Sequence, residues 1–339
     1  MIEDRVPRWR WAVGNIIVDR QLAMHRGRPA VEVVHRVVRA PGTVGVEVAA
    51  PCTWRDGHGE RYGNGPPRME RVDGGFRFEE AYRVSGPGFR PGGVWYRGAR
   101  YRQEAERGLG NREDLWFAGT FQASLAPGEE VGVTAWADDP AQPPPAASQI
   151  IAAARARIAA GRCRPDDDTD RLLAVAASQL LIDGREGPAV VAGYPWFGEW
   201  SRDTMTSYEG LVLETGRASE ARLLLQRAAA SLSEGMRANT TDSGVAESNT
   251  TDATLWFLHA VDRHVAVTGD LDLAASLLGA LAEVIEHHVA GTRHGIRVDP
   301  ADGLLTQGRP GLALTWMDAR IGGVPVTPRA GKAVEINAL

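Results

Sequence analysis

The sequence predicts a chain of two domains, an antiparallel β domain followed by a helical domain. Through residues 1–139, apolar side chains recur at every second position between glycine- and proline-containing turns. From about residue 148 they recur at helical spacing instead. Between these parts, residues 140–148 are too rich in proline for a helix or a central strand, and we expect a stiff linker. The two domains are therefore expected at residues 1–139 and 149–339.

The β domain is predicted from short runs that alternate between apolar and polar residues. Val44, Val46 and Val48 form one such run, and Val131 and Val133 belong to another. Turn strings such as APGT, DGG, SGPG and APGE separate the runs. Because successive side chains of a strand point to opposite faces, each run buries one face, as in an antiparallel β-sandwich.

The helical domain is predicted from apolar stripes, and no strand is expected within it. Helices are expected near residues 148–161, 167–182, 203–215, 218–234, 251–267 and 270–290. The last of them has a continuous stripe made of Leu273, Leu277, Leu281, Val284 and His288. Asp270 is the expected N-cap of that helix, and Ser201 or Asp203 is expected to cap the helix near 203–215.

The composition is that of an ordinary globular protein and excludes several classes of function. A formal net charge of -5 and a pI near 5.9 argue against a nucleic-acid partner, which needs a basic face. No run approaches the roughly 20 apolar residues of a membrane span, so no membrane partner is expected. Cys52 and Cys163 lie far apart without a CxxC spacing, which favours free thiols in the cytoplasm over a disulfide or metal framework.

Three strings in the helical half match one known family in the same order. They are GYPWFGEWSRDTMTSYEGLVLETGR (Gly193–Arg217), SNTTDATLWFLHAV (Ser248–Val261) and DGLLTQGRPGLALTWMDARIGGVPVTPRAGKAVEINAL (Asp302–Leu339). On these strings the chain resembles the glycogen-debranching enzymes of bacterial and archaeal type, in the part related to amylo-α-1,6-glucosidase. The resemblance implies an antiparallel β super-sandwich followed by an (α/α)6 toroid. It also implies inverting hydrolysis of α-1,6-linked glucose in glycogen or another branched α-glucan, such as a limit dextrin.

The chain is short for that fold, because a toroid of roughly twelve helices needs more residues than follow Ser148. We therefore expect a fragment with an incomplete toroid, lacking the C-terminal half of the catalytic toroid and part of the N-terminal domain. The apolar sides near residues 150–182 and 331–339 are then expected to be uncovered, and to bind a partner chain or a second copy. The isolated chain is expected to hydrolyse no α-1,6 glucoside measurably.

Asp318 is the best candidate for a catalytic carboxyl group. Glycosidic hydrolysis generally takes two such groups, one that donates a proton and one that activates water or attacks carbon. In TWMDAR, Asp318 follows Trp316 and Met317, a setting expected to desolvate it so that it stays protonated near neutrality. The resemblance places the general acid at this position and places the general base near the C-terminus of complete relatives, outside this chain. The alternative is an aspartate that only caps a loop.

Arg202 and Asp203 are expected to bind the substrate. The resemblance assigns this pair to the hydroxyls of the non-reducing-end glucose, although Asp203 could also serve only as a helix cap. Trp196 and Trp200, with Phe197, are expected to form a stacking wall for a sugar ring, or else to belong to the core.

A second set of residues completes the candidate binding site. Asp252 and Trp256 are four residues apart, so a helix would present both on one face, although Asp252 near a helix start could merely complement the dipole. Trp316 flanks Asp318, and Glu335 opens the last helix, so both are expected to line the pocket. The histidines lack metal-ligand spacing, no nucleotide-binding motif is present, and neither a metal nor a cofactor is expected.

These observations leave three functions open. The first is an amylo-α-1,6-glucosidase-type glycoside hydrolase. The second is a non-catalytic fragment that binds α-glucan through Arg202, Asp203 and the tryptophans. The third is one half of a split enzyme that a partner chain completes.

Overall fold

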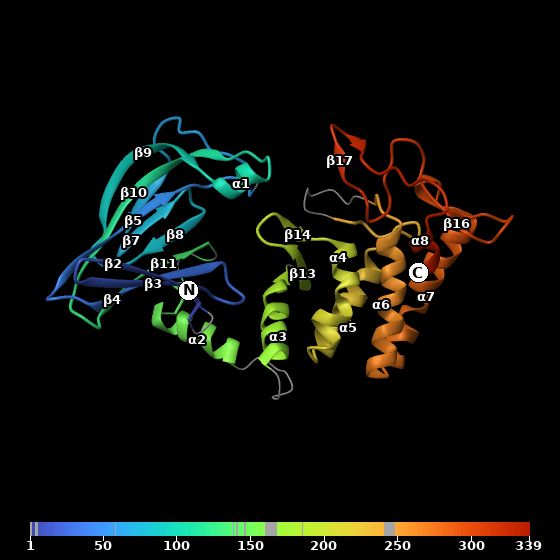
Figure 1. Ribbon diagram of the computed structural model, residues 1–339, viewed down its shortest axis with the longest axis horizontal. Coiled ribbons are helices and arrows are strands. Elements are labelled where there is room, and N and C mark those ends of the chain that lie inside the picture. The colour runs from blue at the N-terminus through green and yellow to red at the C-terminus, as the bar shows by residue number, and fades with distance from the viewer. Residues whose placement is uncertain are drawn as a thin grey trace. The chain divides into compact units, whose positions relative to one another are not determined.

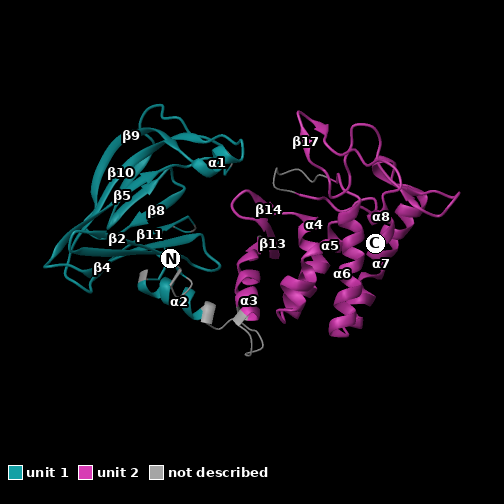
Figure 2. Cartoon of the chain, viewed as in Figure 1, with its two compact units in different colours: residues 1–160 teal, residues 161–339 magenta. Residues whose placement is uncertain are grey.

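The computed structural model describes residues 2–3, 6–57, 59–137, 139, 142–145, 147–159, 168–184, 186–240 and 248–339. The chain forms two compact units, unit 1 (Met1–Ala160) and unit 2 (Gly161–Leu339), which are coloured separately in Figure 2. The first unit is almost entirely antiparallel β and the second is mainly helical, which confirms the order of the two predicted structural classes.

Unit 1 is built from two antiparallel sheets (Figure 1). The larger has the strand order β1-β2-β3-β4-β11-β8-β7-β6, and the smaller has the order β5-β10-β9. A short helix, α1 (Arg102–Glu106), connects β9 to β10. The strands are β1 (Ile2–Glu3), β2 (Val6–Val13), β3 (Ile16–Met24), β4 (Ala30–Arg39), β5 (Val44–Cys52), β6 (Met69–Val72), β7 (Gly75–Phe78), β8 (Tyr82–Ser85), β9 (Arg90–Arg100), β10 (Arg112–Leu125) and β11 (Glu130–Trp136).

The main core of unit 1 lies between the two sheets. Phe76 and Phe78 of the larger sheet pack with Trp116 and Phe121 of the smaller one. Val133 of β11 is buried in the same cluster, as its alternating run predicts. Burial of these large side chains supplies most of the free energy that holds the sheets together.

The first expected helix belongs to unit 1, which corrects the predicted domain boundary. The helix α2 (Ala147–Ala159) packs Ile150, Ile151 and Ala154 against Val6, Ala23 and Val34 of the larger sheet. The boundary therefore follows α2, at Ala160, instead of preceding it at residue 149. Helical spacing shows that an apolar stripe exists but not which sheet it covers. Pro140, Ala141 and Ala146 of the predicted linker lie outside the described residues.

Unit 2 carries helices close to the predicted positions. They are α3 (Asp168–Leu180), α4 (Ser201–Thr206), α5 (Ala218–Ala230), α6 (Asp252–Thr268), α7 (Leu271–Ala290), the 3-10 turn η2 (Arg293–Gly295) and α8 (Val334–Ala338). The helix expected near 203–215 is divided between α4 and a π-helical turn, η1 (Glu209–Leu213). Helices α4 to α7 pack around one core that contains Tyr208, Leu225 and Phe257. The incomplete (α/α)6 toroid stays a prediction.

Helix α7 confirms the predicted stripe and cap. Leu273, Leu277, Val284 and His288 are buried, and Leu281 packs against the core of unit 2. The Asp270 side chain accepts a hydrogen bond of 2.9 Å from the Leu273 amide. Within the described residues, α7 is also the one helix long and apolar enough to cross a bilayer by length and composition. By itself this one helix is weak evidence for a membrane span.

The prediction that unit 2 contains no strand is wrong. A three-stranded antiparallel sheet joins β12 (Leu181–Gly184), β13 (Gly187–Gly193) and β14 (Phe197–Glu199). Its buried run Ala189–Val191 is too short to show a period. Two further pairs are β15 (Arg297–Val298) with β16 (Leu305–Thr306), and β17 (Arg320–Ile321) with β18 (Val324–Pro325).

The predicted side-chain cap of α4 is also wrong. Trp200 occupies the N-cap position and makes no side-chain capping bond. The Ser201 hydroxyl instead donates to the Ala238 carbonyl, and the Ser201 amide donates to the Asn239 carbonyl at 2.7 Å. A neighbouring segment therefore satisfies the start of α4, which a local sequence pattern does not reveal.

Glu32 should make the stability of the protein depend on pH. Its side chain on β4 is buried, it accepts a hydrogen bond from Thr134, and burial raises its pKa to about 7 from 4.5. Between about pH 4.5 and 7, the folded protein keeps the proton on the Glu32 carboxyl group, whereas the unfolded chain loses it. The corresponding stability is present below pH 4.5 and is lost as the pH rises to about 7, a loss of about 3 kcal/mol.

Replacing Glu32 by Gln removes that ionisation. We expect Glu32→Gln to melt above the wild type at pH 8 and to lose most of this advantage at pH 5, as measured by thermal denaturation. Glu130→Gln changes an exposed residue of the same sheet and is the control. An equal difference between Glu32→Gln and wild type at both pH values would contradict the proposed ionisation.

Candidate functional site

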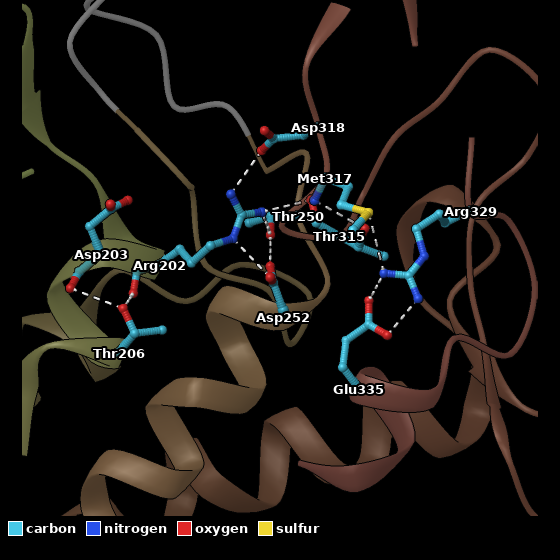
Figure 3. Close-up of polar contacts among 10 residues, drawn as sticks. All are labelled: Arg202, Asp203, Thr206, Thr250, Asp252, Thr315, Met317, Asp318, Arg329 and Glu335. Atoms are coloured by element: carbon cyan, nitrogen blue, oxygen red, sulfur yellow. Dashed lines mark hydrogen bonds and ion pairs between the residues drawn. The ribbon is translucent and has the colours of Figure 1, made fainter. Parts of the chain in front are cut away.

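The guanidinium of Arg202 joins three segments of unit 2. From the second position of α4, its Nε donates to Asp252 Oδ2 and its Nη1 donates to Asp318 Oδ2, each at 2.8 Å (Figure 3). Its Nη2 donates to Thr250 Oγ1 at 2.9 Å and to the Thr315 carbonyl at 3.2 Å. One side chain therefore connects α4, the start of α6 and the loop that carries Asp318.

Backbone geometry explains why these segments meet. Helices α4 and α6 both begin at the site, because α5 returns the chain between them (Figure 1). The Thr251 amide, just before α6, donates to the Leu314 carbonyl at 2.8 Å. This bond holds the loop with Asp318 beside the first turn of α6.

The ion pairs differ in their exposure to solvent. The side chain of Arg202 is 12% exposed, that of Asp252 is 3% exposed, and that of Asp318 is 35% exposed. Thr250 donates to the second oxygen of Asp252, so both oxygens of that carboxylate are engaged. Burial alone would lower the pKa of Arg202, but Asp252 and Asp318 outweigh it and the pKa is raised. The guanidinium is therefore held in place as a cation.

This arrangement changes what Arg202 and Asp252 can offer to a sugar. A guanidinium has five N–H groups, and four of those in Arg202 have partners within the described residues. A free bidentate grip, as expected from the sequence, is not available in this conformation. Asp252, buried and fully engaged, positions Arg202.

Asp203 lies beside the same cation but points away from it in Figure 3. Burial raises its pKa; Arg202 opposes this effect, while Asp318 and Asp252 add to it. Asp203 therefore keeps a proton to a higher pH than an exposed aspartate does. The charge of Asp318 contributes to this rise, so Asp203 lies within electrostatic reach of Asp318.

The surroundings of Asp318 differ from the apolar setting expected from its neighbours. Trp316 is 56% exposed, and the Asp318 side chain is 35% exposed. Asp318 accepts its hydrogen bond from a cation. A tryptophan close in sequence therefore does not ensure desolvation of the aspartate, because the loop leaves the tryptophan exposed.

Arg329 ties the last helix to the loop of Asp318. It hydrogen-bonds both carboxylate oxygens of Glu335, through Nη2 to Oε2 at 2.7 Å and through Nη1 to Oε1. Its Nη1 also lies 3.8 Å from the sulfur of Met317, the residue before Asp318 (Figure 3). Glu335 thus lies near the site as the partner of an arginine.

The candidate tryptophans lie on separate elements. Trp196 is half-buried in the turn between β13 and β14, and Trp200 makes an edge-on contact with Phe197, with ring centroids 6.1 Å apart. Trp256 packs against the main core of unit 2. The sugar-binding roles predicted for Trp196, Trp200, Trp256 and Trp316 stay predictions.

Sequence reasoning missed two contributors to the site. Thr250 was not a candidate, although it lies two residues before Asp252 in the string SNTTDATLWF. Arg329 lies in the string VTPRAGK and was overlooked because its partner, Glu335, is on a different element. For Thr250, the available signal is a polar residue close to a candidate carboxylate. No local signal marks Arg329.

Comparisons with known proteins agree with the two units. The family model of the glycogen debranching enzyme N-terminal domain matches residues 1–132, and that of amylo-alpha-1,6-glucosidase matches residues 169–339. The glycogen debranching enzyme of Saccharomyces cerevisiae is 27% identical over 222 residues, which cover 48% of this chain and 14% of the yeast protein. A solved structure of a putative kojibiose phosphorylase from human microbiome matches with a TM-score of 0.46 and 9% identity, over 90% of this chain and 46% of that one.

Removing the Asp252 carboxylate should weaken the fold of unit 2. Asp252→Asn deprives a buried guanidinium of its most buried partner, and breaking such a pair costs about 3 kcal/mol. Urea denaturation measures the loss. Asp262→Asn, an exposed change on the same helix, should stay within about 0.5 kcal/mol of wild type.

A double-mutant cycle with Arg202→Met separates this pair from other effects. The double variant should lose much less than the sum of the two single variants, because neither charge remains unpaired. Additive losses would show that Asp252 stabilises the fold without acting through Arg202.

Proposed function

Because this chain belongs to the glycogen-debranching enzyme family, we propose that it carries the amylo-α-1,6-glucosidase site, which hydrolyses α-1,6-linked glucose of a branched α-glucan. The family model over residues 169–339 supports the reaction class. The observation that carries the assignment of residues is the meeting of Asp318 with Arg202, with Asp203 in electrostatic reach. Glycogen or a limit dextrin is the proposed substrate.

Asp318 is proposed as the general acid that protonates the leaving glycosidic oxygen. To do so its carboxyl group must take up a proton, and this requires release from Arg202 Nη1. A sugar hydroxyl that accepts a hydrogen bond from Nη1 would replace Asp318 there. Substrate binding and preparation of the acid would then be one event.

Asp203 is proposed to hold hydroxyls of the terminal glucose. Asp203 is the residue after Arg202 in the chain. Its carboxyl group points away from the Arg202 guanidinium, whereas that of Asp252 accepts a hydrogen bond from it. Trp196 and Trp200 are proposed to pack against the apolar face of the ring. Thr250 and Asp252 hold Arg202 in position through hydrogen bonds.

The proposed mechanism is inverting, with the base across the glucose from Asp318. The two carboxyl groups of an inverting site lie roughly 6.5–9.5 Å apart, which leaves room for water. Arg202 engages the carboxylate of Asp252, and Arg329 engages that of Glu335. We therefore assign the base to neither Asp252 nor Glu335. Following the resemblance, we propose that the base is none of the residues in the three strings that match the family.

The cytoplasm is proposed as the compartment of the protein. Cys52 is a buried free thiol whose pKa is raised to about 11 by burial, as in a structural cysteine. Cys163, the other cysteine, lies outside the described residues.

One observation favours the alternative that a partner chain completes the site. Helix α7 leaves Leu271, Leu278, Ile285 and Val289 exposed along one side, and each is at least 56% exposed. Contiguous exposed apolar residues are typical of an interaction surface. Sedimentation velocity of the purified chain tests this, since Leu278→Glu should reduce association and Leu223→Glu on α5 should not.

Substrates with different leaving groups test the role of Asp318. Asp318→Asn should release glucose from a limit dextrin about 100- to 10,000-fold more slowly than wild type, because proton donation is lost while the shape is kept. With α-glucosyl fluoride, whose leaving group needs no proton, the loss should be less than about tenfold. Asp262→Asn is the matched control.

Other outcomes identify the alternatives. If Asp318→Asn lowers the rate of glucose release equally on both substrates, the role of Asp318 as general acid is excluded. If the wild-type chain binds limit dextrin but releases no glucose, and Asp203→Asn abolishes binding, the chain is a glucan-binding fragment.

A further inference from the structure

A β-hairpin begins directly after Asp318. It joins β17 (Arg320–Ile321) to β18 (Val324–Pro325), and the Val326 amide extends the ladder by donating to the Ala319 carbonyl at 2.9 Å. Figure 1 shows this hairpin extending beyond the ends of the helices of unit 2. The candidate acid is therefore the residue at the base of a hairpin that reaches away from the helical core.

The turn and the base of the hairpin are both fixed by the fold. Gly322 and Gly323 form the turn with φ of 57° and 81°, values that a tight two-residue turn requires and that other residues rarely adopt. On one side of the base, Leu314 is buried in an apolar cluster that reaches α8. On the other side, the Arg329 side chain contacts the sulfur of Met317 at 3.8 Å. The register and the position of the hairpin within unit 2 are thus defined.

One face of the hairpin is entirely apolar. Paired residues share a face, and side chains alternate along each strand. The members of this face are Ala319, Ile321, Val324 and Val326. Ile321 is 77% exposed, Val324 is 67% exposed and Val326 is 55% exposed. An antiparallel ladder ordinarily turns polar residues toward solvent, so contiguous apolar residues on an exposed face indicate a binding surface.

The polar contacts of the hairpin lie on its opposite face. Arg320 is on that face with Pro325, and its Nη1 donates to the Gly311 carbonyl and to the Gly323 carbonyl, each at 3.3 Å. Gly311 belongs to the segment that leads into the loop of Asp318. The charged side chain is thus tied back to the chain, while the aliphatic side chains stay in solvent.

The chemistry of a general acid indicates what lies beside the hairpin. The acid protonates the oxygen between the terminal glucose and the rest of the glucan. If Asp203 holds the terminal glucose, the rest of the glucan must leave the site past Asp318. The exposed residues on either side of Asp318 in the chain are Trp316 and those of the hairpin. Aromatic and aliphatic side chains pack well against the apolar faces of pyranose rings.

We propose that the apolar face of this hairpin, together with Trp316, binds the glucan chain on the leaving side of the scissile bond. The surface would then select a branched glucan over a small glucoside, and this inference rests on the proposed α-1,6-glucosidase site. A neutral chain suits the face, because its members carry no charge. A protein partner there would stand next to the carboxyl group that the reaction needs open to its substrate.

Isothermal titration calorimetry of the full chain with limit dextrin and with glucose tests the proposal. The double variant Ile321→Ser/Val324→Ser removes most of the apolar face at exposed positions, where substitutions change stability little. We expect the dissociation constant of limit dextrin to rise about tenfold, and that of glucose, which fills only the terminal position, to rise less than about twofold. Val267→Ser, an exposed change at the opposite end of α6 from Asp252, is the control.

Turnover provides a second measurement on the same variants. In the double variant, kcat/KM for glucose release from limit dextrin should fall about tenfold, while that on α-glucosyl fluoride, which has no leaving sugar, should fall less than about twofold. A merely structural effect would lower both values equally, and would contradict the inference.

The binding and turnover results separate this inference from the proposed reaction. If the wild type binds limit dextrin more tightly than the double variant but neither releases glucose, the hydrolase proposal fails and the glucan-binding role of the hairpin stands. Unchanged binding of limit dextrin in the double variant, or an equal loss of glucose binding, would overturn the inference. A wild-type chain that binds no limit dextrin would overturn it as well.

Discussion

The candidate site depends on one buried guanidinium. Arg202 is charged under all conditions in which the protein folds, and at 12% exposure it must find acceptors inside the chain. Asp252, Thr250, the Thr315 carbonyl and Asp318 supply them. This requirement brings the loop of Asp318 to the first turns of α4 and α6.

The same interaction limits the chemistry of the site. Three aspartates lie around one cation, and they differ in what engages them. Asp252 is buried and fully hydrogen-bonded, Asp318 is partly exposed and bound through one oxygen, and Asp203 has a pKa raised by burial. The buried carboxylate that positions the arginine is thus distinct from the more exposed Asp318, an arrangement compatible with the proposed glycosidase site.

Buried ionisable groups elsewhere in the chain show how residue type decides the response to burial. Glu32 loses its charge, since a carboxylic acid can bind a proton and its pKa rises to about 7. Arg237 has no such route and keeps its charge with its pKa near 10. A buried glutamate therefore makes the stability of the fold depend on pH near neutrality, whereas a buried arginine stays charged there and does not.

The sequence by itself determined the features that depend on local periodicity and on short strings. The alternation in the first half, the stripe of α7 and its Asp270 cap need only neighbouring residues, and the structure confirms them. Arg202, Asp252 and Asp318 could be proposed together because three strings resemble one family. Only the tertiary structure decided that α2 covers the sheet of unit 1, that the segment of Asn239 holds Ser201, and that Thr250 and Arg329 support the site. Each of these depends on hydrogen bonds or packing between different elements, and a local pattern contains no information about which distant residue will satisfy a buried polar group.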